Sequence, residues 1–332
     1  MTQPARFDII AIGNAIVDVI ARADDDFLAA HNMVKGGMQL IDAAGAERIY
    51  AAMGPGLEMS GGSAANSLAG MAALGARCSF IGVVADDQLG QVFRHDLTAL
   101  GVDFTTPARP GQPPTARCLI LVTPDGQRTM NTFLGASQHL GADAFDAAQI
   151  ADADILYLEG YLWNADASRA AMAGAIAMAR AAGRRVAFTL SDGFVIAAHG
   201  DDFRAMLAAG EIDILFANEA EITALAELDD FDAAVDKIAA QTPLLVATRG
   251  EKGAVAVSGG VRYSVAAEPI DQVVDTTGAG DLFAAGFLAG LAEGRRIDDC
   301  LTMGALCARA IIAQVGPRAQ CDLAALVSAR LA

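Results

Sequence analysis

The stretch Asp275-Thr-Thr-Gly-Ala-Gly-Asp281, followed at once by the apolar run LFAAGFLAGL, combines residue types that suit phosphoryl chemistry. Gly278, Ala279 and Gly280 at a helix start leave backbone N–H groups uncovered, and the helix dipole adds to their attraction for an anion. Asp281 falls in the first helical turn, where a carboxylate is an ordinary cap. It could also accept the proton of a hydroxyl that attacks a bound phosphoryl group. The residues alone leave both roles open.

A second candidate site is Asn218-Glu-Ala-Glu221, which follows the apolar run 212–217. Mg²⁺ prefers hard oxygen ligands and keeps several waters, so one or two carboxylates suffice to hold it. Asn218 and Glu221 also have the spacing of a helix capping box, and the two roles are compatible. Thr248-Arg249-Gly250 closes the next predicted strand, where Arg249 could meet a phosphate or face solvent.

Two familiar nucleotide-binding patterns are missing from the sequence. The chain contains no Gly-Lys pair, which excludes a Walker P-loop. No GxGxxG follows the first predicted strand, which argues against a dinucleotide-dependent dehydrogenase. Asn14 and Asp18 stand there instead, at the carboxyl end of that strand, the edge where open α/β sheets bind ligands.

The elements that must position these residues alternate along the chain. Short apolar runs predict buried strands at 7–12, 78–84, 155–158, 185–190, 212–217 and 244–248. Helical patterns lie between and after them, at 64–74, 88–100, 168–182, 202–209, 220–228, 231–241, 281–293, 298–314 and 322–331. Such alternation is typical of an α/β fold with a mainly parallel sheet covered by helices on both faces.

Residues 15–42 and 102–133 break that alternation with short β-type runs joined by turn signals such as Pro124-Asp-Gly126. They predict a small β-rich lid at one edge of the main sheet. No linker, repeat or low-complexity segment divides the chain. We therefore expect one domain over residues 1–332 that carries this lid.

Composition restricts the partners. The net charge is −17, with only three lysines among 332 residues, so nucleic acids and anionic membranes are not expected to bind. No apolar run approaches the roughly 20 residues of a membrane span, and the N-terminus lacks a signal-peptide pattern, so we expect a cytoplasmic protein. The five cysteines are scattered, which argues against a disulfide framework or a zinc site.

The segment DTTGAGDLFAAGFLAGL, residues 275–291, resembles the C-terminal signature of the ribokinase-like (PfkB) carbohydrate kinase family. GGSAANSLAGMAALGARCSFIGVVADDQLG, residues 61–90, is similar to the N-terminal signature of that family. The likeness extends from Ile9 to about Cys321. It implies a three-layer α/β/α ribokinase-like fold and an ATP-dependent kinase. Asp281 would then be the general base, and the amides of residues 278–280 would form an anion hole.

The resemblance also implies roles for residues around the nucleotide. Glu221 would reach Mg²⁺ through water, and Asn218 would lie near the phosphates with Thr248, Arg249 and Gly250. Asp275 and Thr277 occupy positions that hold a monovalent cation in many relatives, which leaves K⁺ as a further candidate. ATP would be the co-substrate.

On the acceptor side, the resemblance gives Asp18 two sugar hydroxyls, makes Gly61-Gly62 the hinge and floor of the pocket, and adds Asn66 as another hydroxyl ligand. Asn14 belongs to the same site. Arg128, in the predicted lid, could neutralise the transferring charge on closure or could face solvent.

The motifs at 14–18, 61–66 and 126–129 look closer to adenosine and nucleoside kinases than to ribokinase, which favours the 5′-hydroxyl of adenosine as acceptor. Candidate apolar walls for a purine are Met38, Leu40, Phe133 and Phe194. A sugar kinase acting on a ribose-, fructose- or ketodeoxy-sugar-like hydroxyl is the alternative. A non-catalytic nucleotide-binding protein is a third hypothesis. Either a monomer or a homodimer is compatible with the sequence.

Overall fold

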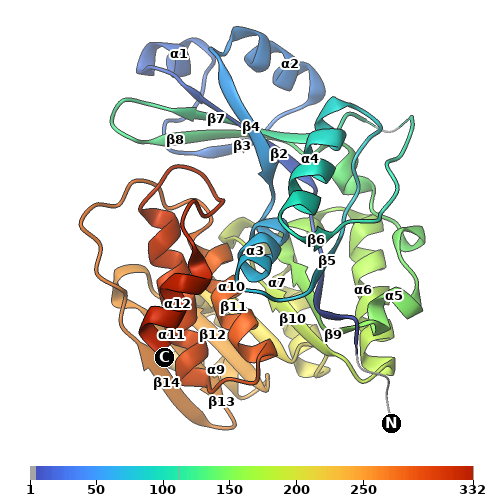
Figure 1. The fold of residues 1–332 in the computed structure, drawn as a ribbon, viewed down its shortest axis with the longest axis vertical. Helices are drawn as coiled ribbons and strands as arrows, with labels where there is room; N and C mark the ends of the chain where they lie inside the picture. The colour runs from blue at the N-terminus through green and yellow to red at the C-terminus, as the bar shows by residue number, and fades with distance from the viewer. Residues whose placement is uncertain (1–4, 112, 332) are drawn as a thin grey trace.

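The computed structural model describes residues 5–111 and 113–331. Residues 1–4, 112 and 332, which fall within the expected domain and lid ranges, lie outside the described part. The chain forms a nine-stranded sheet in the order β14-β13-β12-β11-β10-β9-β1-β5-β6 and a five-stranded sheet in the order β3-β8-β7-β2-β4. Figure 1 shows the smaller sheet above one end of the larger one.

The strands of the large sheet lie close to the positions that the apolar runs predict. The parallel strands are β1 (Phe7–Ile12), β5 (Cys78–Ile81), β6 (Val102–Asp103), β9 (Ala153–Glu159), β10 (Arg185–Thr189), β11 (Ile214–Asn218) and β12 (Leu244–Thr248). β13 (Ala254–Ser258) and β14 (Val261–Val265) complete one edge as an antiparallel hairpin. The predicted mainly parallel sheet is confirmed.

Helices cover both faces because neighbouring side chains of each strand point to opposite sides. Ile9 and Ala11 of β1 belong to one buried cluster, and Ile10 and Ile12 belong to the other. The first face carries α3 (Ser63–Ala73), α4 (Gln88–Ala99), α10 (Ala279–Ala292), α11 (Ile297–Ile312) and α12 (Leu323–Leu331). The second face carries α5 (Ala147–Ala151), α6 (Asp166–Ala181), α7 (Gly193–Ala208), α8 (Glu219–Ala226) and α9 (Phe231–Ala239). These three layers are those of the predicted ribokinase-like fold.

The lid consists of β2 (Ile16–Arg22), β3 (Met38–Leu40), β4 (Gly56–Gly61), β7 (Ala116–Val122) and β8 (Arg128–Phe133). Helices α1 (Asp25–Ala30) and α2 (Ala43–Ala52) cover its outer face, as Figure 1 shows. The expected lid ranges need two corrections. β4 belongs to the lid, and residues 102–103 pair with β5 in the large sheet. The sequence GLEMSG of β4 alternates apolar and polar residues over only four positions between glycines, and the two residues 102–103 are too few to show any pattern.

Candidate active site

A cavity of about 490 Å³ lies between the lid and the carboxyl ends of the large-sheet strands. Its lining includes the predicted residues Asn14, Asp18, Gly62, Asn66, Asn218, Glu221, Thr248, Thr277, Gly278, Ala279, Gly280 and Asp281. These residues come from five separate parts of the sequence, so the fold brings the candidate motifs into one site. Gly61, Arg128, Arg249, Gly250 and Asp275 do not line it.

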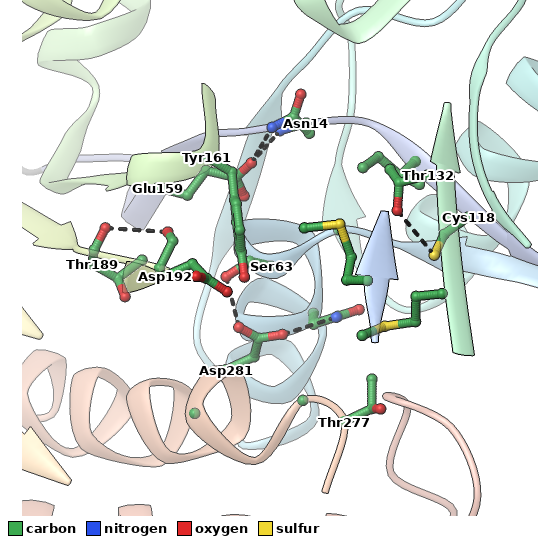
Figure 2. Close-up of a pocket in the computed structure, with 18 of the residues that line it drawn as sticks. Asn14, Ser63, Cys118, Thr132, Glu159, Tyr161, Thr189, Asp192, Thr277 and Asp281 are labelled. Carbon is green, nitrogen blue, oxygen red and sulfur yellow. Dashed lines mark hydrogen bonds between the residues drawn. The ribbon is translucent and has the colours of Figure 1, made fainter. Parts of the chain in front are cut away.

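Asp281 lies in the first turn of α10, and its carboxylate accepts two hydrogen bonds from the first turn of α3. Ser63 Oγ donates to Oδ1 at 2.6 Å, and Asn66 Nδ2 donates to Oδ2 at 2.9 Å. Figure 2 shows Ser63 directly across from the carboxylate. Burial raises the pKa of Asp281, and the two hydrogen bonds oppose that rise. Sequence reasoning missed Ser63, although it is the third residue of the 61–66 motif.

The amides at the start of α10 differ in part from the expected anion hole. Gly278 is the N-cap with φ +77°, a left-handed conformation that favours glycine. The amide of Ala279 donates to the carbonyl of Thr276 at 3.1 Å, so a turn already satisfies it. Among the described residues, the amides of Gly278, Gly280 and Asp281 have no protein acceptor. These three N–H groups are the ones free to hold an anion.

Arg128 reaches from the lid to the loop of residues 275–281, which we call the catalytic loop. Its guanidinium donates to Thr277 Oγ1 at 3.0 Å and pairs with Asp275 Oδ2 at 2.6 Å. The side chains of Arg128 and Asp275 are only 8% and 2% exposed, so the solvent-facing alternative for Arg128 is wrong. The pair connects the lid directly to the catalytic loop.

The carboxylate of Asp275 has three partners: two backbone amides and the guanidinium of Arg128. The amide of Thr277 donates to Oδ1 at 3.0 Å, the amide of Gly316 donates to Oδ2 at 2.9 Å, and Arg128 pairs with Oδ2. A monovalent cation does not fit at this carboxylate, because the guanidinium already supplies the positive charge there and would repel a second one.

Asn14 is fixed by Glu159, the last residue of β9. One carboxylate oxygen of Glu159 accepts hydrogen bonds from the amide and the side chain of Asn14 at 2.8 and 2.7 Å, and the other accepts from the amide of Ala64 at 2.8 Å. Burial raises the pKa of Glu159 to about 7. Figure 2 shows this contact as dashed lines between Asn14 and Glu159. Sequence reasoning missed Glu159, although it follows a predicted strand at the ligand-binding edge.

Asp18, on β2, lies against the hinge glycines. Burial raises its pKa to about 7, while the charges of Arg318 and Arg128 oppose that rise. A Cβ atom added at Gly61 would lie 2.4 Å from Asp18 Oδ2, and one added at Gly62 would lie 2.3 Å from the carbonyl oxygen of Asn14. Gly61 does not line the cavity. Its lack of a side chain nevertheless leaves the space that the Asp18 carboxylate occupies.

The rest of the cavity wall is largely apolar. It includes Ile16, Met38, Leu40, Ile120, Met130 and Leu134 from the lid, and Tyr161, Phe194, Phe216 and Phe283 from the large domain. The expectation for Phe133 is wrong, because side chains of β8 alternate and the inward set is Met130 and Thr132. The rings of Tyr161 and Phe194 lie 6.0 Å apart, centroid to centroid.

Asn218 and Glu221 form the predicted capping box of α8 and also line the cavity. Asn218 donates from its amide at 3.0 Å and from Nδ2 at 2.6 Å to the two carboxylate oxygens of Glu221. Burial, and then the nearby charge of Asp192, raise the pKa of Glu221 to about 7. The two neighbouring carboxylates, Glu221 and Asp192, suit a hard cation. Within residues 5–111 and 113–331, no group of three or more His, Cys, Asp or Glu could ligate a metal, so waters would complete the shell.

Only one residue of the Thr248-Arg249-Gly250 turn reaches the cavity. Thr248 lines it, whereas Arg249 pairs with Glu219 at 2.9 Å and stacks on Phe231, 3.9 Å from the ring centroid. The partners on α8 and α9 therefore direct Arg249 away from the cavity in this structure. Its guanidinium contributes to the packing of these helices.

In the described ranges, no helix is both long and apolar enough to cross a membrane.

Comparison with known proteins identifies the family. Residues 55–323 match the pfkB family carbohydrate kinases. The chain belongs to the PfkB family of carbohydrate kinases. This PfkB kinase is therefore an ATP-dependent kinase, as its two sequence signatures predict.

Relatives of this PfkB kinase carry different acceptor names. An adenosine kinase from Sinorhizobium meliloti is 47% identical, with a TM-score of 0.91 and coverage of 98% of this chain and 99% of its own. A probable sugar kinase from Rhizobium etli CFN 42 is 45% identical, with a TM-score of 0.92 and coverage of 98% of both chains. A fructokinase from Klebsiella pneumoniae is 31% identical over 71% of this chain and 78% of its own length. The predicted likeness to the adenosine kinase branch is confirmed, and the acceptor is not decided by these names.

Proposed function

We propose that this PfkB kinase transfers the γ-phosphate of ATP to the 5′-hydroxyl of adenosine. One observation carries the proposal: the cavity wall combines hydroxyl-binding groups, Asn14, Asp18 and Asn66, with a set of apolar and aromatic side chains. A nucleoside needs the same combination, because its ribose is polar and its purine needs apolar or aromatic surfaces. The adenosine kinase from Sinorhizobium meliloti, 47% identical, supports the same acceptor.

The hydroxyl-binding groups would hold the ribose. Asp18, Asn14 and Asn66 line the cavity, and a carboxylate such as Asp18 binds paired hydroxyls well. The 5′-hydroxyl would then lie at Asp281, which accepts the proton as the hydroxyl attacks the phosphorus. Ser63 and Asn66 orient the carboxylate for this transfer. An acceptor hydroxyl would share Asp281 Oδ1 with Ser63 or replace it.

The transferring phosphoryl group would bind the free amides of Gly278, Gly280 and Asp281 at the positive end of α10. Phosphoryl transfer requires mainly positioning and charge stabilisation, which these donors supply. Thr248 and Asn218 line the cavity near the start of α8 and would contact the phosphates of ATP. When Mg²⁺ is bound, Glu221 and Asp192 would hold it through water, and the ion would neutralise the phosphate oxygens.

The lid would exclude water during transfer. Arg128 connects β8 to the catalytic loop through Thr277 and Asp275, and this contact would hold the lid over the cavity. A closed site protects ATP from hydrolysis and strengthens every charge interaction inside it. A kinase whose lid stayed open would lose both effects.

A sugar kinase is the second candidate. The set Asn14, Asp18 and Asn66 would bind a bare furanose as well as a ribose, and the similar fructokinase and probable sugar kinase are consistent with that. A bare sugar would leave the wall of Leu40, Tyr161 and Phe194 without a partner, which is why we favour the nucleoside.

The test is a coupled ADP-release assay with Mg-ATP across adenosine, guanosine, inosine, cytidine, ribose and fructose. We expect adenosine to give the highest kcat/KM, and ³¹P NMR of the product to show a 5′-phosphate. Turnover of fructose or ribose with a kcat/KM above that of every nucleoside would contradict the proposal and favour the sugar kinase.

A further inference from the structure

The loop that follows α11 lies between the lid hinge and the catalytic loop. The amide of Gly316 donates to Asp275 Oδ2 at 2.9 Å. A Cβ added at Gly278 would lie 3.2 Å from the Cβ of Pro317, so the two residues are in close contact. Arg318, the residue after Pro317, is not part of the cavity lining.

Arg318 binds both sides of the Gly61-Gly62 hinge. Its Nε donates to the carbonyl of Ser60 at 3.1 Å, and one terminal nitrogen donates to Ser60 Oγ at 3.0 Å. The other terminal nitrogen donates to the carbonyl of Ala65 at 2.8 Å. Ser60 is the last residue but one of β4, and Ala65 lies in the first turn of α3, so the guanidinium fixes the two elements that the glycines join.

The same turn of α3 carries the two donors to the general base. Ser63 and Asn66 flank Ala65 and hold the two oxygens of Asp281. A shift of the hinge relative to α3 would move both donors. The contacts of Arg318 therefore act on the position of Asp281 through Ser63 and Asn66.

The charge of Arg318 has an unusual setting. Among the described residues it makes no ion pair within 4 Å, and its hydrogen-bond partners are two carbonyls and a hydroxyl. Burial lowers its pKa to about 10, so it stays cationic at neutral pH, and the charges of Asp18 and Asp281 favour that form. In return, Arg318 opposes the burial-driven rise in the pKa of both carboxyls.

Apart from Arg318, the groups around Asp281 are neutral or negative, and the one exception is Arg128. The elements packed around it carry Ser63 and Asn66 on α3, Asp18 on β2, Tyr157 and Glu159 on β9, Tyr161 after β9 and Arg128 on β8. The charge of Arg128 faces Asp275 at 2.6 Å. Arg318 is thus the cation whose charge acts on the pKa of Asp281.

We propose that Arg318 is a positioning residue for phosphoryl transfer: it holds the hinge so that Ser63 and Asn66 stay on Asp281, and it supplies a buried positive charge to Asp281 and Asp18. The proposal rests on the assignment of Asp281 as general base. The role belongs to a residue that does not line the cavity.

The test compares Arg318→Gln, Arg318→Lys and a matched control, Arg94→Gln. Arg94 also binds two backbone carbonyls, those of Phe104 and Thr106, and burial also lowers its pKa, but it lies away from the cavity. The readout is the pH dependence of kcat/KM for the acceptor with the highest turnover, with urea unfolding measured in parallel.

We expect Arg318→Gln to move the acid limb of the profile up by roughly half a pH unit or more and to lower kcat/KM at pH 7 about tenfold. Arg318→Lys keeps the charge but loses the planar fork of the guanidinium. Its acid limb should lie at the wild-type pH, and its kcat/KM should recover only in part. Arg94→Gln should lower stability and leave the limb in place.

An unmoved acid limb in folded Arg318→Gln, or an equal shift in Arg94→Gln, would overturn the proposal. If Arg318→Gln does not fold, the proposal is tested by Arg318→Lys alone. An acid limb that is shifted from the wild-type pH in that variant would overturn the proposal. Failure of the proposed function is distinguishable, because it would appear in the wild type as absent nucleoside turnover. Failure of the Arg318 proposal appears only in the variants.

Discussion

Gly61→Ala isolates the contribution of Asp18 to acceptor binding. The new Cβ would lie 2.4 Å from Asp18 Oδ2, 2.5 Å from Cγ and 2.6 Å from Oδ1, so all three atoms of the carboxylate would be too close. An ordinary contact is about 3.5 Å, so the carboxylate must move by roughly 1 Å. Hydrogen bonds weaken steeply with such a displacement.

The expected loss follows from the bonds that Asp18 would make. A hydrogen bond to a charged group contributes about 1.5–3 kcal/mol, so losing one should raise the KM for the acceptor roughly ten- to hundredfold. The KM for ATP should change less than about threefold, because the phosphate-binding amides of α10 are untouched. Steady-state kinetics with each substrate varied in turn measure both constants.

The matched control is Gly174→Ala in α6. A Cβ at Gly174 meets no atom within 4 Å, and alanine in a helix interior is expected to stabilise it by about 1 kcal/mol. Its kinetics should equal those of the wild type. A folded Gly61→Ala enzyme with a normal KM for the acceptor would refute the placement of Asp18 in the acceptor site.

Three further outcomes follow from the site. The rate should stay within about twofold when K⁺ is replaced by tetramethylammonium, because Arg128 supplies the charge at Asp275; a tenfold fall would contradict this. Burial raises the pKa of Glu159 from 4.5 to about 7. The folded protein thus binds a proton there that the unfolded chain has lost, and stability should fall as pH rises through that window. Glu159→Gln should reduce that fall by on the order of 3 kcal/mol in urea unfolding, and parallel curves would exclude the effect. Arg249→Met should cost about 1 kcal/mol of stability through the lost stack on Phe231 and leave the KM for ATP unchanged, whereas a tenfold rise would return Arg249 to the phosphates.

The sequence predicted the elements whose signals are local. Buried strands such as β1 and β12 begin and end where their apolar runs do, because a strand covered on both faces needs no polar residue. The end of each strand then located Asn14 and Asn218, since parallel strands end at one edge of the sheet. The lid strand β4 has no such run, and its place depends on pairing with β2.

Side-chain direction was the part that sequence could not supply. The sequence left the direction of both Arg128 and Arg249 open. In the structure, Arg128 contacts Asp275 and Thr277 of the catalytic loop. Arg249 pairs with Glu219 and so points away from the cavity. Phe133 was expected in the cavity because a purine needs apolar or aromatic walls, but strand alternation puts its side chain on the other face of β8 from Met130 and Thr132. Glu159 acts on Asn14 from 145 positions away, a separation that no local pattern reports.

The most direct test of the account is the turnover of Asp281→Asn. The variant keeps the free amides of α10 and a side chain of the same size, so ATP should bind with an affinity within a few-fold of the wild type by calorimetry. Without a proton acceptor, kcat should fall at least a hundredfold, whereas Asp232→Asn, a change at an exposed surface carboxylate, should leave it unchanged. Near-wild-type turnover in Asp281→Asn would contradict the assignment of the general base.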